Sequence, residues 1–127
     1  MPLSSLELLR KLAQVVYDKK GFNIIALDVR GLSSMTDYFL IAEGHVERHV
    51  IAMAKAIEDE LSESGEKGVL IEGLESGDWV VIDGWEVVVH LFVPSLRQHY
   101  QLERVWQQAK LVELGLDTSE EAGEFAS

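Results

Sequence analysis

One short segment constrains the fold more than any other part of the chain. The pair Asp83-Gly84 separates two apolar runs, 79–82 and 85–92. Asp-Gly is favoured in the two-residue turn whose twist matches that of two antiparallel strands. The sequence therefore predicts a β-hairpin over 79–92.

Residues alternate between the two faces of a strand, so the hairpin has two predictable faces. With a two-residue turn, one face holds Trp79, Val81, Glu86, Val88, His90 and Phe92, and the other holds Val80, Ile82, Trp85, Val87, Val89 and Leu91. Both faces are largely apolar. Such a pair of strands is typical of the centre of a sheet covered by helices, although one face could instead meet a partner.

The remaining sequence predicts three helices and three further strands. Ser4 and Glu7 have the spacing of a capping box, which indicates the start of the first helix. The helices are expected from Ser4 to about Lys20, over 45–61, and from Pro94 to about Gly115, and the strands at 22–29, 37–42 and 69–71. The order α-β-β-α-β-β-β-α predicts a single α/β (α+β) domain, with a mixed sheet of about five strands flanked by helices.

The chain is strongly acidic, with 11 basic and 22 acidic residues in 127 and a net charge of −11. Residues 57–86 hold ten acids and one base, Lys67, and so account for −9 of this charge. This argues against direct binding of free nucleic acid, which needs clustered Lys and Arg. The acidity suits a basic partner, or serves only solubility.

We expect a folded domain over 1–112, followed by an acidic, flexible tail over 113–127. The chain contains no cysteine, which agrees with a reducing compartment. Its N-terminus does not resemble a signal peptide, and no apolar run approaches the roughly 18 residues of a membrane span. A soluble, cytoplasmic protein without membrane contact is therefore expected.

Residues that could carry chemistry are sparse. His45 and His49 lie four residues apart at a predicted helix start, but lack the metalloprotease spacing and a third ligand. His90, among valines, suits a hydrogen-bonded core or interface histidine. Two-metal phosphoryl transfer needs alternating acids on one strand, and Asp28 is followed by Val29 and Arg30. We therefore expect no catalytic residue, no cofactor and no metal site.

Three segments nevertheless carry a recognisable combination of motifs, spanning about Leu6 to Ala109. They are Asp28-x-Arg30 with Asp37-Tyr38-Phe39-Leu40-Ile41; Gly44 with Arg48-His49; and Gly73-x5-Trp79-x3-Asp83-Gly84, Val89-His90-x-Phe92 and Arg97-x2-Tyr100-x-Leu102-Glu103-x2-Trp106. Together they resemble the ribosomal silencing factor family, also called the Iojap or RsfS family.

The resemblance implies a nucleotidyltransferase-like fold without that superfamily's catalytic carboxylate pair. It implies binding to the large ribosomal subunit through ribosomal protein L-fourteen, which blocks joining of the small subunit and represses translation; several members form homodimers. Family docking residues map onto Trp79 and Val80, with a supporting surface from Asp83, His90, Arg97 and Tyr100.

A physical argument supports that mapping. Trp79 stands at the edge of an apolar patch beside Glu75 and Asp78, which gives an aromatic anchor with an acidic rim. Without the family resemblance, cross-strand core packing is the favoured interpretation of Trp79. Two other functions stay open: an active nucleotidyltransferase, and an acidic adaptor for another basic protein.

Overall fold

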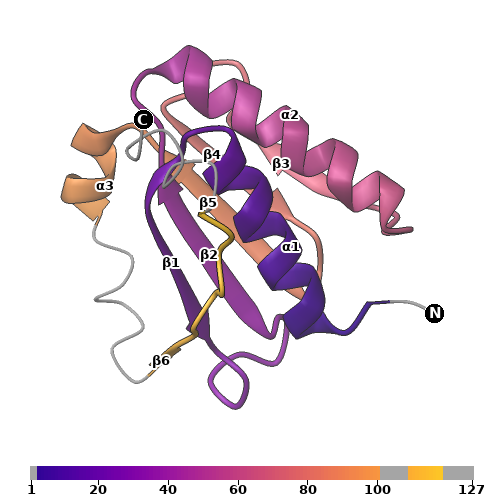
Figure 1. The fold of residues 1–127 in the computed structure, drawn as a ribbon. Helices are drawn as coiled ribbons and strands as arrows, with labels where there is room; N and C mark the ends of the chain where they lie inside the picture. Colours follow the sequence, from indigo (N-terminus) through magenta and orange to yellow (C-terminus); the bar gives the residue numbers. More distant parts are fainter. Residues whose placement is uncertain (1–2, 101–108, 119–127) are drawn as a thin grey trace.

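The computed structural model describes residues 3–100 and 109–118, which fold into one mixed sheet with two long helices on one side (Figure 1). The elements are α1 (Ser5–Asp18), β1 (Phe22–Asp28), β2 (Tyr38–Glu43), α2 (Glu47–Glu63), β3 (Leu70–Glu72), β4 (Trp79–Asp83), β5 (Val87–Phe92), α3 (Pro94–Tyr100) and β6 (Lys110–Leu111). The sheet order is β3-β4-β5-β2-β1-β6. Only the β2–β5 pair of these strands is parallel. The expected α+β domain with a mixed sheet is confirmed.

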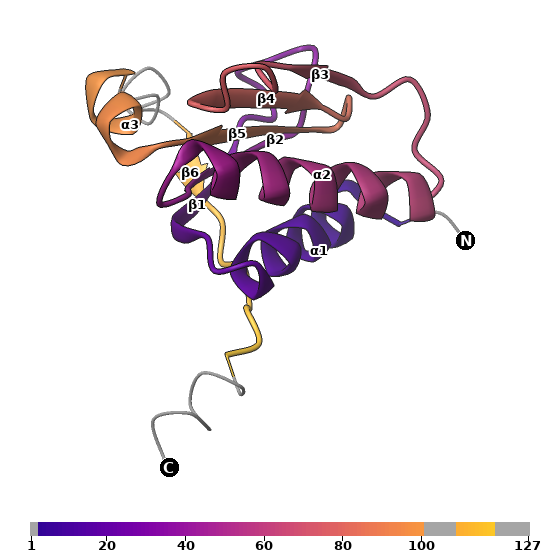
Figure 2. The ribbon, with the colours of Figure 1, turned by 90° about the horizontal axis from the view of Figure 1, so that it is seen from above.

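Helix α1 begins where the capping box predicts. The Ser4 hydroxyl accepts a hydrogen bond from the Glu7 amide at 3.1 Å, and the Ser4 amide donates to the Glu7 carboxylate at 3.2 Å. This exchange satisfies two backbone donors that a helix start otherwise leaves unpaired. Helices α1 and α2 lie side by side and cover the same face of the sheet (Figure 2).

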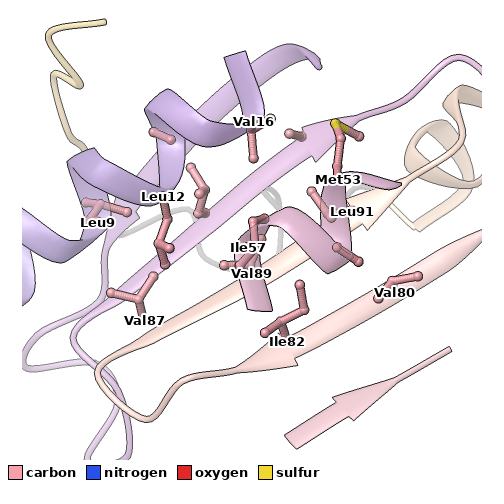
Figure 3. Close-up of a cluster of buried hydrophobic side chains, with 14 of the residues drawn as sticks. Leu9, Leu12, Val16, Met53, Ile57, Val80, Ile82, Val87, Val89 and Leu91 are labelled. Carbon is pink, nitrogen blue, oxygen red and sulfur yellow. The ribbon is translucent and has the colours of Figure 1, made fainter. Parts of the chain in front are cut away.

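The face of the hairpin that meets these helices forms the main core, and we call it the closed face. Its members, Val80, Ile82, Val87, Val89 and Leu91, are all fully buried. Figure 3 shows them beside Leu9, Leu12 and Val16 of α1 and Met53 and Ile57 of α2. The apolar side chains of the two helices and of the closed face therefore pack in one cluster, as the sequence predicts.

The hairpin turn is one residue longer than predicted and begins one residue later. Asp83 is the last residue of β4, and residues 84–86 form the turn, with Trp85 at φ 71°. The Asp83 carboxylate accepts from the Trp85 amide at 2.9 Å, and Gly84 donates to the carbonyl of Val87. Val81 therefore pairs with His90. Since the pairing shifts by an even number of residues, the predicted faces are confirmed for the residues of β4 and β5. The prediction is wrong for Trp85 and Glu86, which lie in the turn and are exposed.

The predicted last helix is also too long. Helix α3 begins at Pro94 as predicted, but Lys110 and Leu111 form β6, which pairs with β1. The expected stripe residues Leu102, Val105 and Trp106 lie outside the described residues. This edge strand makes six strands where about five were expected, because a two-residue strand leaves no periodic signal.

The first residues of the predicted tail lie against α1. Arg10 donates to the Glu113 carbonyl, and the Gln14 amide pairs with the backbone of Asp117 through both its oxygen and its nitrogen. A boundary after residue 112 stays a prediction.

Among the described residues, no helix is long and apolar enough to cross a membrane.

Candidate protein-binding face

The other face of the hairpin points away from α1 and α2. We call this the open face, and it continues onto β3 through the register that pairs Leu70 with Asp83 and Glu72 with Val81. Its members are Leu70, Glu72, Trp79, Val81, Asp83, Val88, His90 and Phe92. Leu70 and Glu72 are exposed, Phe92 is fully buried, and the other five are half-buried. Among the described helices, only the short α3 lies on this side, at one end of the sheet (Figure 2).

An aromatic cluster organises the centre of the open face. The Trp79 ring stacks on Phe92, with ring centroids 5.1 Å apart, and its indole nitrogen donates to Nδ1 of His90 at 3.2 Å. Phe39 of the neighbouring β2 meets His90 edge-on at 5.7 Å. Strand β5 thus holds the Trp79 ring by stacking and by a hydrogen bond, and Phe39 of β2 supports the ring of His90.

Burial sets the charge of His90. It lowers the pKa of His90 to about 4, because the surrounding rings and valines disfavour the imidazolium form. The imidazole is therefore neutral at pH 7. This agrees with the Trp79 contact, since a neutral Nδ1 can accept the indole N–H and a protonated one cannot.

Gly73 allows the chain to enter β4 beside Trp79. Gly73 has φ 94°, and a Cβ at this position would overlap the carbonyl of Trp79. The Gly77 amide donates to the Gly73 carbonyl at 2.9 Å, which closes the loop that precedes Trp79. The motif Gly73-x5-Trp79 therefore has a structural cause: only glycine permits this close approach.

Acidic residues lie near the aromatic cluster, both in the sheet and in the loop that precedes Trp79. Glu72 and Asp83 belong to the open face itself, and Glu75 and Asp78 precede Trp79 in the loop. The Asp78 carboxylate accepts from the Ser76 hydroxyl at 2.7 Å. The face thus joins an aromatic centre to a negative rim, the arrangement expected for a basic protein partner.

The structure brings together only some of the predicted docking residues. Trp79, Asp83 and His90 share the open face. Val80 lies on the closed face with 0% exposure, so its side chain is not part of this surface. The prediction erred because Val80 was mapped by its place in the motif, while neighbours along a strand point to opposite faces.

Arg97 also has an internal role. Its guanidinium lies 3.5 Å from the Glu43 carboxylate and donates to the Asn23 carbonyl at 3.1 Å, with 10% of its side chain exposed. Arg97 thereby fastens the start of α3 to the end of β2. Tyr100 is the last residue of α3, and its side chain lies outside the described residues.

Sequence reasoning missed two residues of this surface. Leu70 is 60% exposed, but only the β3–β4 register reveals that it shares a face with Trp79. Phe39 reaches His90 because β2 runs parallel to β5, pairing Phe39 with Val88. Both placements depend on how separate strands pair, so no local pattern could identify them.

The other candidate residues form no chemical centre. His49 Nδ1 accepts from the His45 amide at 2.9 Å, and its Nε2 contacts the Lys19 carbonyl, so His49 ties the end of α1 to the start of α2. A charge-assisted hydrogen bond from Arg30, at 2.8 Å, lowers the pKa of Asp28. No group of three metal-ligating side chains occurs in the part of the chain that the structure describes.

Comparison with known proteins identifies relatives of this chain. The family model described as "Ribosomal silencing factor during starvation" matches residues 2–127. The ribosomal silencing factor RsfS of Bacillus subtilis is 40% identical over 97 residues, 76% of this chain and 82% of that protein. Mouse "Mitochondrial assembly of ribosomal large subunit protein 1" is 31% identical over 98 residues, 75% of this chain and 43% of the mouse protein.

Solved structures agree with this relationship. A crystal structure from Bacillus halodurans superposes with a TM-score of 0.72 at 38% identity, covering 83% of this chain and 96% of that one. The family model and the Bacillus subtilis relative are named as silencing factors, which describes a regulatory rather than a catalytic role. The chain belongs to the ribosomal silencing factor (RsfS) family.

Proposed function

We propose that this protein binds the large ribosomal subunit through ribosomal protein L-fourteen and sterically prevents the small subunit from joining. Translation is then repressed without any bond being made or broken. The observation that carries the proposal is the open face, where Trp79 is held by Phe92 and His90 inside an acidic rim. Family membership supplies the ribosome as the target.

The open face has the physical properties that such a contact needs. Trp79 is half-buried and its ring is already held, so binding costs little side-chain ordering. Large, positioned aromatic side chains contribute most of the affinity at many interfaces. The acidic rim attracts a basic ribosomal protein and disfavours direct contact with the RNA backbone. We therefore place the contact between proteins.

The proposal includes a cytoplasmic location, where subunits meet. A homodimer, which the family resemblance implies, stays a prediction; light scattering of the purified protein tests it directly.

A subunit-association experiment tests the proposed function. Purified small and large subunits are mixed with the protein, and the fraction of joined ribosomes is measured by sucrose-gradient sedimentation. We expect wild-type protein to co-sediment with the large subunit and to lower the joined fraction. Trp79→Ala should lose at least tenfold in potency, because it removes the anchor.

Trp85→Ala is the matched control, since Trp85 is 51% exposed at the hairpin turn and does not belong to the open face. It should act as wild type does. Wild-type protein that fails to co-sediment would overturn the proposed function, and equal potency of the two variants would overturn the proposed site.

A further inference from the structure

The tryptophan contact determines which nitrogen of His90 carries the proton. The indole N–H of Trp79 donates to Nδ1 at 3.2 Å, so Nδ1 must be the unprotonated nitrogen. A neutral imidazole carries its single proton on the other nitrogen. His90 therefore presents Nε2–H as a hydrogen-bond donor.

Within residues 3–100 and 109–118, no side chain or backbone group accepts from this donor. Trp79 is the only residue in the described segments that hydrogen-bonds to the His90 ring, whose other neighbours are the rings of Phe39 and Phe92. His90 is half-buried on the open face. Among the described residues, its Nε2 is not one of the fully buried side-chain atoms that lack a hydrogen-bond partner, so the Nε2–H remains partly exposed within an apolar surface. A partner that covers this surface without an acceptor would leave the donor buried and unpaired, which weakens binding.

The surrounding charges limit what the acceptor can be. His90 pairs with Val81, which pairs with Glu72, so His90 and Glu72 lie in one row two strands apart, roughly 10 Å. Asp83 lies on the same face, two residues along β4 from Val81. A carboxylate acceptor would meet these acids, whereas a main-chain carbonyl of a basic segment would not.

We propose that His90 is a specificity-determining residue of the open face, whose Nε2–H donates to a main-chain carbonyl of the basic ribosomal protein that covers Trp79. The inference rests on the proposed function and names the polar contact that fixes the partner's register. The Trp79–His90 pair then has two tasks: the indole supplies apolar contact, and by donating to Nδ1 it keeps the donor on Nε2.

Three substitutions distinguish the contributions of Nδ1 and Nε2 of His90 to binding. The binding partner in each measurement is the purified large ribosomal subunit. His90→Asn keeps an acceptor near the Nδ1 position but has no donor at the Nε2 position. His90→Gln places an amide N–H near the Nε2 position, and His90→Phe provides neither group. We expect Asn and Phe to weaken binding about tenfold and Gln to restore most of it, because an unpaired buried donor or acceptor is costly.

Nitrogen NMR of the free, full-length protein provides a second readout. At pH 7, His90 should show the neutral tautomer that is protonated at Nε2, a signature that packing alone does not set. The Nδ1-protonated tautomer would overturn the inference, as would wild-type affinity of the Asn and Phe variants.

The two proposals fail differently. If wild-type protein binds and Trp79→Ala weakens binding while His90→Asn and His90→Phe bind normally, the open face is the site and only the His90 inference is overturned. If wild-type protein does not bind the large subunit, both are overturned. Thermal denaturation identifies variants with impaired folding, and for these the tautomer measurement on wild type decides.

Discussion

The two faces of one hairpin differ in burial although their composition is similar. On the closed face, Val80, Ile82 and Leu91 are fully buried under α1 and α2. On the open face, Trp79, Val81 and His90 are half-buried and border acidic side chains. A single residue step along β4 thus separates a stabilising position from a position available to a partner.

The difference follows from what covers each face. Two amphipathic helices with a combined 31 residues (14 in α1 and 17 in α2) lie on the closed face. The described residues place only α3, of seven residues, on the other side. Apolar side chains that their own fold covers this sparsely are typical of interaction surfaces.

The largest effect should come from a cavity on the closed face. Leu91→Ala removes a fully buried side chain between the sheet and the helices, and we expect it to lower the free energy of unfolding by about 2–5 kcal/mol. Urea denaturation measures the change. Val88→Ala, on the open face of the same strand, is the matched control and should cost under about 1 kcal/mol. Equal losses would show that the two faces are equally packed.

His90 should make the stability of the protein depend on pH. Its pKa is about 4 in the folded state and near the ordinary 6.5 in the unfolded chain, so between these values the unfolded state binds more protons. Stability is therefore full above pH 6.5 and falls as the pH drops towards 4, by on the order of 3 kcal/mol. Thermal denaturation of wild type and His90→Phe across this range isolates the contribution, which should disappear in the variant.

Gly73→Ala tests how the backbone positions Trp79. A Cβ here would overlap the Trp79 carbonyl at φ 94°, so the chain must shift where it enters β4. We expect a loss of about 1–3 kcal/mol in unfolding free energy, together with weaker binding to the large subunit. Gly65→Ala is the control: it also has positive φ, but a Cβ there meets no atom within 4 Å. If Gly73→Ala binds the large subunit as wild type does, the loop that precedes Trp79 does not position the binding site.

Salt should have the smallest effect, and it should act on the acidic rim alone. Charges on this rim are screened over a Debye length of about 8 Å at physiological ionic strength. Raising the salt concentration should slow association with the large subunit and change dissociation little, because the aromatic contact is not charged. Stopped-flow kinetics separates the two rates. If the association rate does not depend on salt, the acidic residues of 57–86 serve only solubility and do not attract the partner.

Local patterns in the sequence were sufficient to predict most of the fold. Residues close together in the chain determine three features: the Ser4–Glu7 capping box, the apolar periodicity of α1 and α2, and the alternation of β4 and β5 residues between the two faces of the sheet. The turn position was not predictable, because the Glu86 carbonyl accepts from Thr36, Asp37 and Tyr38, about 50 residues away. Strand β6 likewise depends on pairing with β1.

The candidate site was predictable only where the alternation of strand residues between the two faces of the sheet determines it. Alternation places Trp79 and His90 on one face, but motif matching alone added Val80, which lies on the other. The internal role of Arg97 was not predictable because its partner, Glu43, is 54 residues away. Contacts between distant segments decide whether a charged side chain faces a partner or the interior.

The central claim is that the open face, and not the closed face, binds the large ribosomal subunit. The most direct test compares the affinities of Trp79→Ala and Val80→Ala for purified large subunits, measured at a temperature where both variants are folded. The account predicts at least a tenfold loss for Trp79→Ala and wild-type affinity for Val80→Ala, whose only expected defect is lower stability. Wild-type affinity of Trp79→Ala, or an equal loss in both, would contradict it.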